Sequence, residues 1–246
     1  MENIKNRSFL QGARDGIPIA LGYISVSFAF GMLAIEKGLP LWSPLLISIT
    51  NFTGTGQFMG IDLIASGVAF AELTFAILII NMRYFLMSLS LSQRLPENMS
   101  LWRRLVIAFG NTDEIFAVSM QRPAPLGFSY MMGLILVPYL GWNFGTVLGA
   151  MASSALPLSV RSALGIAIYA MFIAIIIPPS RTMKPIAKII LLSVTLSCCF
   201  RYIPYLNQLS SGWVIIICGV VSAALGAYFY PVDTEDTRGA GDSDES

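Results

Sequence analysis

The sequence predicts an all-α polytopic membrane protein, because of its composition and the grouping of its apolar residues. Of its 246 residues, 55% are hydrophobic and only 12% are charged, roughly half the charged share of a soluble domain. The apolar residues form runs near 20 residues, the length at which a helix crosses about 30 Å of hydrocarbon. These features exclude an ordinary soluble enzyme, a disordered chain and a nucleic-acid-binding domain.

Seven apolar segments are expected to cross the membrane. They lie at residues 17–36, 43–67, 70–92, 127–150, 154–178, 186–203 and 212–230. The last is framed by Trp213 and Tyr230, the aromatic-belt pattern of a true span. An eighth stretch, 105–121, is apolar at both ends and polar in the middle, which predicts an interfacial helix or a re-entrant segment.

The chain is expected to form one transmembrane domain over residues 1–232, embedded in the lipid bilayer. Residues 233–246 hold six acidic residues and one arginine, a composition typical of a disordered tail. The chain has no histidine, which excludes histidine-based metal sites and proton relays. Its three cysteines (Cys198, Cys199 and Cys218) lie in apolar runs and indicate neither a disulfide nor a metal site. No metal or other cofactor is therefore expected.

The distribution of basic residues predicts an N-terminus outside the cell and a C-terminus inside. With seven crossings, and Arg83 and Arg161 set aside as intramembrane, nine basic residues fall inside and four outside, as the positive-inside rule requires. The nine are Lys37, Arg94, Arg103, Arg104, Arg122, Arg181, Lys184, Lys188 and Arg238, and the four are Lys5, Arg7, Arg14 and Arg201. Two groups of three spans on either side of residues 94–126 also favour an inverted repeat.

The stretch NFTGTGQF, at the centre of the second segment, is the first candidate binding element. Its two glycines disfavour a continuous helix, which predicts a broken helix at the midplane of the second span. Freed backbone groups at such a break can hold a substrate. The alternative is a close helix-packing site, but the flanking polar side chains favour binding. The candidate residues are Asn51, Thr53, Gly54, Thr55, Gly56 and Gln57.

Arg83, in the middle of the third segment, is the strongest single candidate. A charge at the centre of the bilayer costs about 2.5–3.5 kcal/mol on insertion scales, so it faces the protein interior and needs a partner. The guanidinium can grip a carboxylate with two hydrogen bonds. The partner is either a substrate carboxylate or an acid of another helix, and a substrate could displace such an acid. Asn81, two residues earlier, adds a neutral hydrogen-bonding group.

Asp113 and Glu114 follow Asn111 and Thr112 within the stretch 105–121. One interpretation is a helix start, with Thr112 or Asp113 as the N-cap and Glu114 in the first turn. The other makes Asp113 or Glu114 the intramembrane partner of Arg83, or a proton carrier with a raised pKa. Any proton coupling would need such a carboxylate, because the chain lacks histidine.

Five stretches, in this order, resemble the AzlC family of branched-chain amino acid permeases. They are GIPIALGYISVSFAFGMLA (16–34), NFTGTGQF (51–58), NMRYFLMSLSL (81–91), TDEIFAV (112–118) and IAIYAMFIAIIIPP (166–179). The resemblance covers nearly all of residues 9–230. It implies a multi-pass inner-membrane subunit that exports branched-chain and related apolar amino acids with a small AzlD-type membrane partner. Family members typically carry a histidine directly after the arginine of the third segment, whereas this chain has Tyr84, so a coupling mechanism does not transfer.

The sequence therefore predicts a secondary transporter subunit, and not an enzyme, that exports apolar amino acids such as valine, isoleucine, leucine or methionine. We expect the substrate carboxylate to bind Arg83 or the amides of Thr53–Gly56. Asn51, Gln57 and Asn81 would add hydrogen bonds, and Asp113 or Glu114 would meet the ammonium group. Phe52 and Phe58 would surround the side chain. The alternatives are a passive channel for a small polar solute and an intramembrane enzyme built on Asp113 and Glu114.

Overall fold

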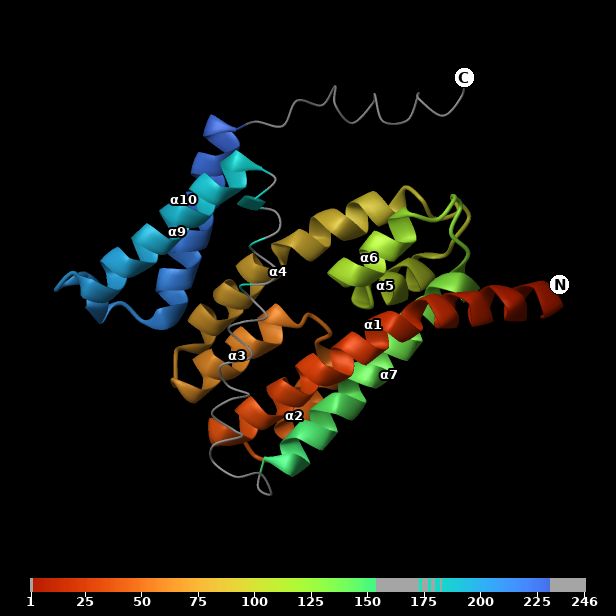
Figure 1. Ribbon diagram of the computed structural model, residues 1–246, viewed down its shortest axis with the longest axis horizontal. Helices are drawn as coiled ribbons and strands as arrows, with labels where there is room; N and C mark the ends of the chain where they lie inside the picture. The colour runs from red at the N-terminus through yellow and green to blue at the C-terminus, as the bar shows by residue number, and fades with distance from the viewer. Residues whose placement is uncertain (1, 154–172, 174–176, 178–179, 182, 231–246) are drawn as a thin grey trace. The chain divides into compact units, whose positions relative to one another are not determined.

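The computed structural model describes residues 2–153, 173, 177, 180–181 and 183–230 (Figure 1). Within these residues the regular structure is entirely helical. The chain divides into two compact units, Met1–Met171 and Phe172–Ser246. Most of the predicted segment 154–178 and the whole acidic tail, 233–246, lie outside the described residues. The single domain over 1–232 stays a prediction.

Five described helices are long and apolar enough to cross a membrane. They cover Ser8–Glu36 within α1 (Glu2–Glu36), Phe70–Ser92 (α4), Phe128–Ala152 (α7), Lys184–Tyr202 (α9) and Ser211–Phe229 (α10). They correspond to the predicted segments 17–36, 70–92, 127–150, 186–203 and 212–230. The prediction of a polytopic helical membrane protein is confirmed in this form, but the count of seven crossings is not confirmed.

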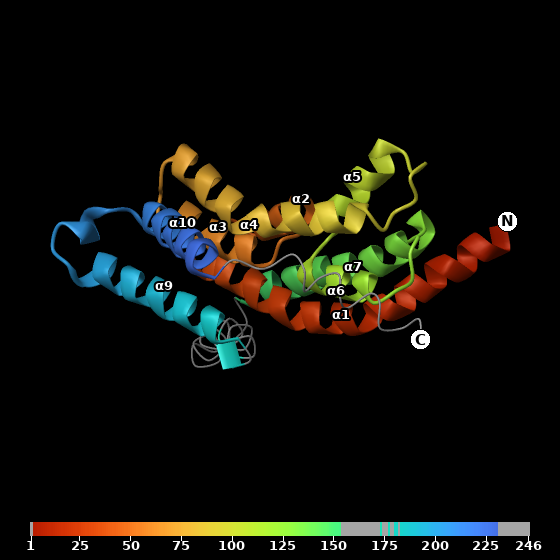
Figure 2. The ribbon, with the colours of Figure 1, turned by 90° about the horizontal axis from the view of Figure 1, so that it is seen from above.

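α1 and α7 run parallel and pack along most of their lengths, as both ribbon views show (Figure 1, Figure 2). Glycines bring the two backbones together. A Cβ atom on Gly12 would lie 2.0 Å from the Tyr130 carbonyl oxygen, and a Cβ on Gly149 would lie 1.9 Å from that of Phe28. Residues early in α1 contact residues early in α7, and residues late in α1 contact residues late in α7, so the two helices run in the same direction. Small residues serve here, as elsewhere in membranes, to permit close van der Waals packing.

The predicted second span, 43–67, is instead two short helices, α2 (Ser43–Thr50) and α3 (Thr55–Ala65), joined by residues 51–54. α2 runs antiparallel to α7, because Ser48 contacts Thr146 whereas Phe52 reaches back to Tyr139. α3 turns back and runs parallel to α1. The ring pair Phe30–Phe58 and then the ion pair Lys37–Asp62 mark its course.

The prediction of one crossing over 43–67 is therefore replaced by a helical hairpin. Hydropathy cannot separate these two arrangements, since both arms of the hairpin are as apolar as a span. The two glycines and the polar residues around them mark where the chain reverses. We call α2, residues 51–54 and α3 the first hairpin, and residues 51–54 its tip.

A second hairpin follows α4. It consists of α5 (Leu101–Phe109), a tip at residues 110–112, and α6 (Asp113–Met120). α5 runs parallel to α7, with Arg103 over the Phe128 ring and Phe109 against Tyr139. α6 runs back along α7, where Ser119 lies beside Met131. Of the two predictions for 105–121, the re-entrant shape fits this reversal, and the helix start at Asp113 is confirmed.

α4 runs antiparallel to α3. A Cβ on Gly60 would lie 3.6 Å from Ile77, and a Cβ on Gly56 would lie 2.8 Å from the Asn81 side chain. The described part of the second unit contains α9 and α10, which pack antiparallel. There Lys188 donates to the Tyr230 hydroxyl, and Gly226 lies against Ile189.

Candidate binding site between two hairpin tips

The two hairpin tips meet at a cavity of about 180 Å³. The first hairpin contributes four lining residues, the second contributes three, and α4 contributes one. They are Thr50, Asn51, Phe52 and Thr53, then Ala108, Phe109 and Asn111, and Tyr84. Two segments that are far apart in sequence thus build one cavity that polar and aromatic side chains line together.

Backbone geometry at the first tip depends on Gly54. Its φ of +54° lies in the left-handed region, where residues with a Cβ are disfavoured. The Gly54 amide donates to Gln57 Oε1 at 3.3 Å, and Thr53 Oγ1 donates to Asn51 Oδ1 at 2.8 Å. The first bond satisfies a backbone amide at the reversal, and the second pairs two side chains of the tip.

Gln57 also locks the two arms of the first hairpin to α7. Its Nε2 donates to Ser48 Oγ at 3.1 Å, Ser48 pairs with Thr146 Oγ1 at 2.9 Å, and Thr146 donates to the Trp142 carbonyl oxygen at 2.9 Å. Gln57, Ser48 and Thr146 are each at most 1% exposed. A fully satisfied buried chain of this kind holds the arms in one arrangement.

The middle turns of α4 supply three polar side chains to the first hairpin, one at its tip and two at the first turn of α3. Asn81 lies against Gly56, where a Cβ would come within 3.0 Å of both its terminal atoms. The Tyr84 hydroxyl donates to the Thr53 carbonyl oxygen at 2.9 Å. Arg83 Nη2 lies 3.5 Å from Thr55 Oγ1 and 3.2 Å from the Tyr84 oxygen.

Arg83 reaches the second hairpin as well as the first. Its Nη2 lies 3.0 Å from Asp113 Oδ2, in the first turn of α6. The predicted pairing of Arg83 with an acid of another helix is therefore found, with Asp113 as the acid. The side chains of Arg83 and Asp113 are 43% and 46% exposed in the described chain, so another molecule has room to approach the pair.

Glu114 has a different partner, Tyr23 of α1. The Tyr23 hydroxyl donates to the Glu114 carboxylate and lies 2.7 Å from Thr112 Oγ1. Sequence reasoning did not select Tyr23, whose only signal was a phenol in an apolar span. Thr112 is the N-cap residue of α6, but its side chain makes no capping hydrogen bond, because Tyr23 engages it instead.

Asn111 is a site residue that sequence reasoning passed over in favour of the acids beside it. It is 2% exposed and lines the cavity. Its Nδ2 donates to Ser88 Oγ at 3.2 Å, while its Oδ1 has no hydrogen-bond partner. A buried acceptor without a donor costs free energy. Asn111 therefore carries, beside the cavity, a buried acceptor without a donor.

Aromatic side chains form the apolar part of the wall. Phe52 packs edge-on against Tyr23, Tyr139 and Trp142, at centroid distances of 5.7, 5.4 and 6.2 Å. Phe109 approaches Tyr139 from the second hairpin, at 6.1 Å. Phe52 lines the cavity, and its contact with a substrate side chain stays a prediction. Phe58 packs edge-on against Phe30 of α1.

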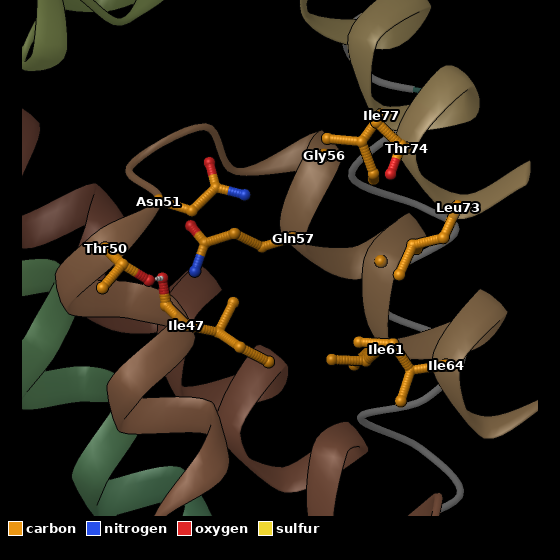
Figure 3. Close-up of a pocket in the computed structure, with 11 residues that line it drawn as sticks. Ile47, Thr50, Asn51, Gly56, Gln57, Ile61, Ile64, Leu73, Thr74 and Ile77 are labelled. Atoms are coloured by element: carbon orange, nitrogen blue, oxygen red, sulfur yellow. Dashed lines mark hydrogen bonds between the residues drawn. The ribbon is translucent and has the colours of Figure 1, made fainter. Parts of the chain in front are cut away.

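A second pocket, of about 350 Å³, opens between the arms of the first hairpin and α4 (Figure 3). Figure 3 shows Ile47 of α2 facing Ile61 of α3 across it, with Asn51 and Gln57 towards the tip. Thr50 and Asn51 line both cavities. The second pocket is mainly aliphatic and adjoins the first.

An ion pair joins each hairpin to α1 away from the tips. Lys37 and Asp62 lie 2.9 Å apart at the carboxyl end of α1. Arg122, just after α6, lies 2.6 Å from Asp15 Oδ2, which also accepts a hydrogen bond from Tyr130. The hydrogen bond to Asp15 raises the pKa of the Arg122 guanidinium, which stays charged. We call the end of each hairpin that lies away from its tip its base. The two ion pairs hold both bases to α1.

Five described helices are long enough to span a membrane, and a cavity lies between two helix reversals, so the described residues form a helical membrane protein with a candidate binding cavity. A family model described as AzlC protein matches residues 18–156, which include both hairpins. The chain belongs to the AzlC family.

Relatives of this chain are named as membrane or transport proteins. The inner membrane protein YgaZ of Escherichia coli K12 is 29% identical over 178 residues, 69% of this chain and 72% of its own length. An uncharacterized membrane protein of Archaeoglobus fulgidus is 35% identical over 71% of this chain and 77% of its own length. The branched-chain amino acid transport protein AzlC of Bacillus subtilis is 23% identical over 65% of this chain and 63% of its own length. No solved structure matches.

Proposed function

We infer that this protein is a secondary transporter subunit that exports apolar α-amino acids, such as valine, isoleucine, leucine or methionine, across the bacterial inner membrane. The observation that carries the proposal is the 180 Å³ cavity between the hairpin tips, beside the Arg83–Asp113 pair. Family membership and the name of the Bacillus subtilis relative support the substrate class.

The residues around the cavity match the three parts of such a substrate. The substrate carboxylate pairs with Arg83 and displaces Asp113, since a guanidinium can hold a carboxylate through two hydrogen bonds. Asp113, once released, faces the ammonium group. Phe52, Ala108 and Phe109 surround the aliphatic side chain. The two charged groups of the substrate thus pair with the two charged groups of the protein. This pairing lowers the free-energy cost of placing a zwitterion inside the membrane.

The substrate-binding set predicted from the sequence divides into two roles under this proposal. Asn51 and Thr53 line the cavity, and Arg83 and Asp113 meet the charged groups of the substrate. Gly54, Thr55, Gly56, Gln57 and Asn81 shape and hold the tip. Glu114, bound to Tyr23, positions the start of α6.

Efflux of valine from cells loaded with a valine-containing dipeptide tests the proposal. We expect Arg83→Gln to lower the efflux rate about tenfold or more at normal expression, because it removes the carboxylate partner. Arg103→Gln is the matched control, since Arg103 lies over the Phe128 ring at the base of α5 and not at the cavity. Unchanged efflux in Arg83→Gln would contradict this site.

We also propose a small AzlD-type membrane subunit as partner, which the family resemblance implies. α4 carries large apolar side chains that are exposed in the described chain, and these suit helix-to-helix contact as well as lipid. They include Phe70, Phe75, Leu78, Met82, Phe85, Leu86 and Leu89. Affinity purification from native membranes should recover a hydrophobic protein of about half this chain's size. Full transport activity of this chain reconstituted alone would contradict the partner proposal.

A further inference from the structure

We propose that the two hairpins enter the membrane from opposite faces and hold the substrate between their tips, where Asn111 Oδ1 accepts a hydrogen bond from its ammonium group. The substrate part of this inference rests on the proposed function. The membrane arrangement does not, because it follows from helix directions, lengths and charges. It also replaces the inverted repeat predicted around 94–126 with a shorter one.

The helix directions place the bases of the hairpins at opposite faces. α1 and α7 begin at the same face, which we call the N-face, and end at the C-face. The first hairpin has its base at the C-face, because Asp62 pairs with Lys37 at the end of α1. The second hairpin has its base at the N-face, because Arg122 pairs with Asp15, which also accepts a hydrogen bond from Tyr130 in the first turn of α7.

The helix lengths bring each tip to the middle of the membrane and no further. The four arms have 8, 11, 9 and 8 residues, or about 12–17 Å at 1.5 Å per residue, close to half of the hydrocarbon thickness. The tips also lie beside the midpoints of three spanning helices. Tyr23, Tyr84 and Tyr139 mark these midpoints on α1, α4 and α7, and each contacts a tip residue.

Several backbone groups at the tips have protein partners, which lowers the cost of irregular backbone at such a depth. At the first tip, the Thr53 carbonyl oxygen accepts from Tyr84 and the Gly54 amide donates to Gln57. At the second tip, the amides of Asn111 and Thr112 donate to the carbonyl oxygens of Ala108 and Gly110. Irregular backbone of this kind is tolerated at membrane depth where it lines a protein cavity.

The basic residues give the arrangement an orientation. Residues 1–153 hold nine lysines and arginines, of which Arg83 lies in mid-membrane and Lys37 lies at the C-face. The other seven fall at the N-face, in its loops or in the turns next to it. They are Lys5, Arg7, Arg14, Arg94, Arg103, Arg104 and Arg122. Seven against one places the N-face in the cytoplasm, opposite to the orientation that seven crossings predict.

The repeat that results pairs α1 and the first hairpin with α4 and the second hairpin. α1 and α4 run in opposite directions, and each is followed by a hairpin that returns to the middle from the face where that helix ends. Such inverted units commonly form transport sites at their shared midplane. Each tip then separates the cavity from one side of the membrane, while the ion pairs at the bases hold the arms to α1.

Asn111 marks the ammonium position within the cavity. Its Oδ1 is buried and has no hydrogen-bond partner, its Nδ2 donates to Ser88, and the residue lines the cavity. An ammonium group donates three hydrogen bonds and has no acceptor, so it complements this oxygen. A substrate analogue with hydrogen in place of the ammonium group would leave this oxygen without a donor.

Cysteine labelling tests the membrane arrangement without a transport assay. In a full-length background with Cys198, Cys199 and Cys218 changed to serine, single cysteines replace exposed residues of four loops: Leu41→Cys, Ala69→Cys, Asn98→Cys and Gln121→Cys. We expect a membrane-impermeant maleimide to label the first two in intact cells and the last two only after permeabilisation. If Leu41→Cys and Ala69→Cys were labelled from different sides of the membrane, the first hairpin would be overturned. Labelling of Asn98→Cys and Gln121→Cys from different sides would overturn the second. A reversed pattern would overturn the orientation.

Substrate preference tests Asn111. We expect Asn111→Leu to reduce the preference for valine over isovalerate, which has no hydrogen-bond donor in place of the ammonium group, at least fivefold relative to the unmodified chain. Ser88→Ala, which leaves Oδ1 in place, should change this ratio by less than twofold. An unchanged ratio in Asn111→Leu would overturn the ammonium assignment. Failure of the Arg83→Gln efflux test would instead overturn the proposed function, whatever the labelling pattern.

Discussion

Arg83 Nη2 and Asp113 Oδ2 lie 3.0 Å apart and join the middle of α4 to the first turn of α6. The pair connects the second hairpin to the helix that also holds the first tip through Tyr84. Its two side chains are nearly half exposed, so the ion pair contributes modestly to stability. Because the pair is accessible, a zwitterionic substrate could separate the two side chains and pair with both of them.

The ion pair predicts a separation of stability from transport. Arg83→Gln leaves the Asp113 carboxylate without its partner, and we expect a loss of about 1 kcal/mol in stability, which is discounted for the exposure of both groups. Adding Asp113→Asn removes the unpaired charge and should restore the thermal midpoint of the detergent-solubilised protein. Valine efflux should stay low in the double variant. Restored efflux would show that the arginine acts only as a structural partner.

Tyr84 predicts a smaller effect on the same tip. Tyr84→Phe removes the hydroxyl that donates to the Thr53 carbonyl oxygen and accepts from Arg83. The loss of one such hydrogen bond costs about 0.5–1.5 kcal/mol, so we expect valine efflux to fall about two- to tenfold. Initial rates at equal membrane abundance measure this. Tyr139→Phe, whose hydroxyl donates to the Ile49 carbonyl oxygen, tests whether any lost tyrosine hydroxyl has the same effect.

Ala108 predicts a change in selectivity. It lines the cavity opposite the first tip, and a larger side chain there reduces the space for the substrate. We expect Ala108→Val to lower leucine and methionine efflux more than alanine efflux, since discrimination by a methylene-sized volume is worth about 1–3 kcal/mol. Ala71→Val, at an exposed position of α4, is the control. Equal reduction of all substrates by Ala108→Val would place the side-chain pocket elsewhere.

Hydropathy located the long helices because a span must be apolar over its whole length. It could not reveal that the chain reverses at Gly54, since each arm of a hairpin is as apolar as half a span. The polar residues around that glycine nonetheless marked the tip, and the isolated charge of Arg83 predicted an acidic partner. Both features could be predicted because polar and charged residues are costly inside a membrane and therefore rare in membrane segments.

Other site residues could not be found in this way, because nothing local makes them unusual. Tyr23 and Tyr84 are compatible with any membrane helix, and only the fold shows that their hydroxyls contact Thr112 and the Thr53 carbonyl oxygen. Asn111 stood beside two acids that drew attention from it. Its importance lies in an acceptor left without a donor, which is a property of three-dimensional packing.

The contact of α1 with α7 predicts strong sensitivity at Gly149. A Cβ there would lie 1.9 Å from the Phe28 carbonyl oxygen and 2.7 Å from its carbonyl carbon, so the two helices would have to separate. Overpacking of this kind costs about 1–3 kcal/mol. We therefore expect Gly149→Ala to lower the thermal midpoint and the membrane abundance of the protein, measured by fluorescence-detected size exclusion on a tagged chain.

Gly22, on the exposed side of α1, provides the matched control because a Cβ there meets nothing within 4 Å. Gly22→Ala should leave the thermal midpoint unchanged or raise it slightly, since alanine favours the helix over glycine by up to about 1 kcal/mol. The two variants make the same chemical change in neighbouring helices, so a difference between them reports the helix contact. Equal midpoints would mean that α1 and α7 do not pack through these glycines in the membrane.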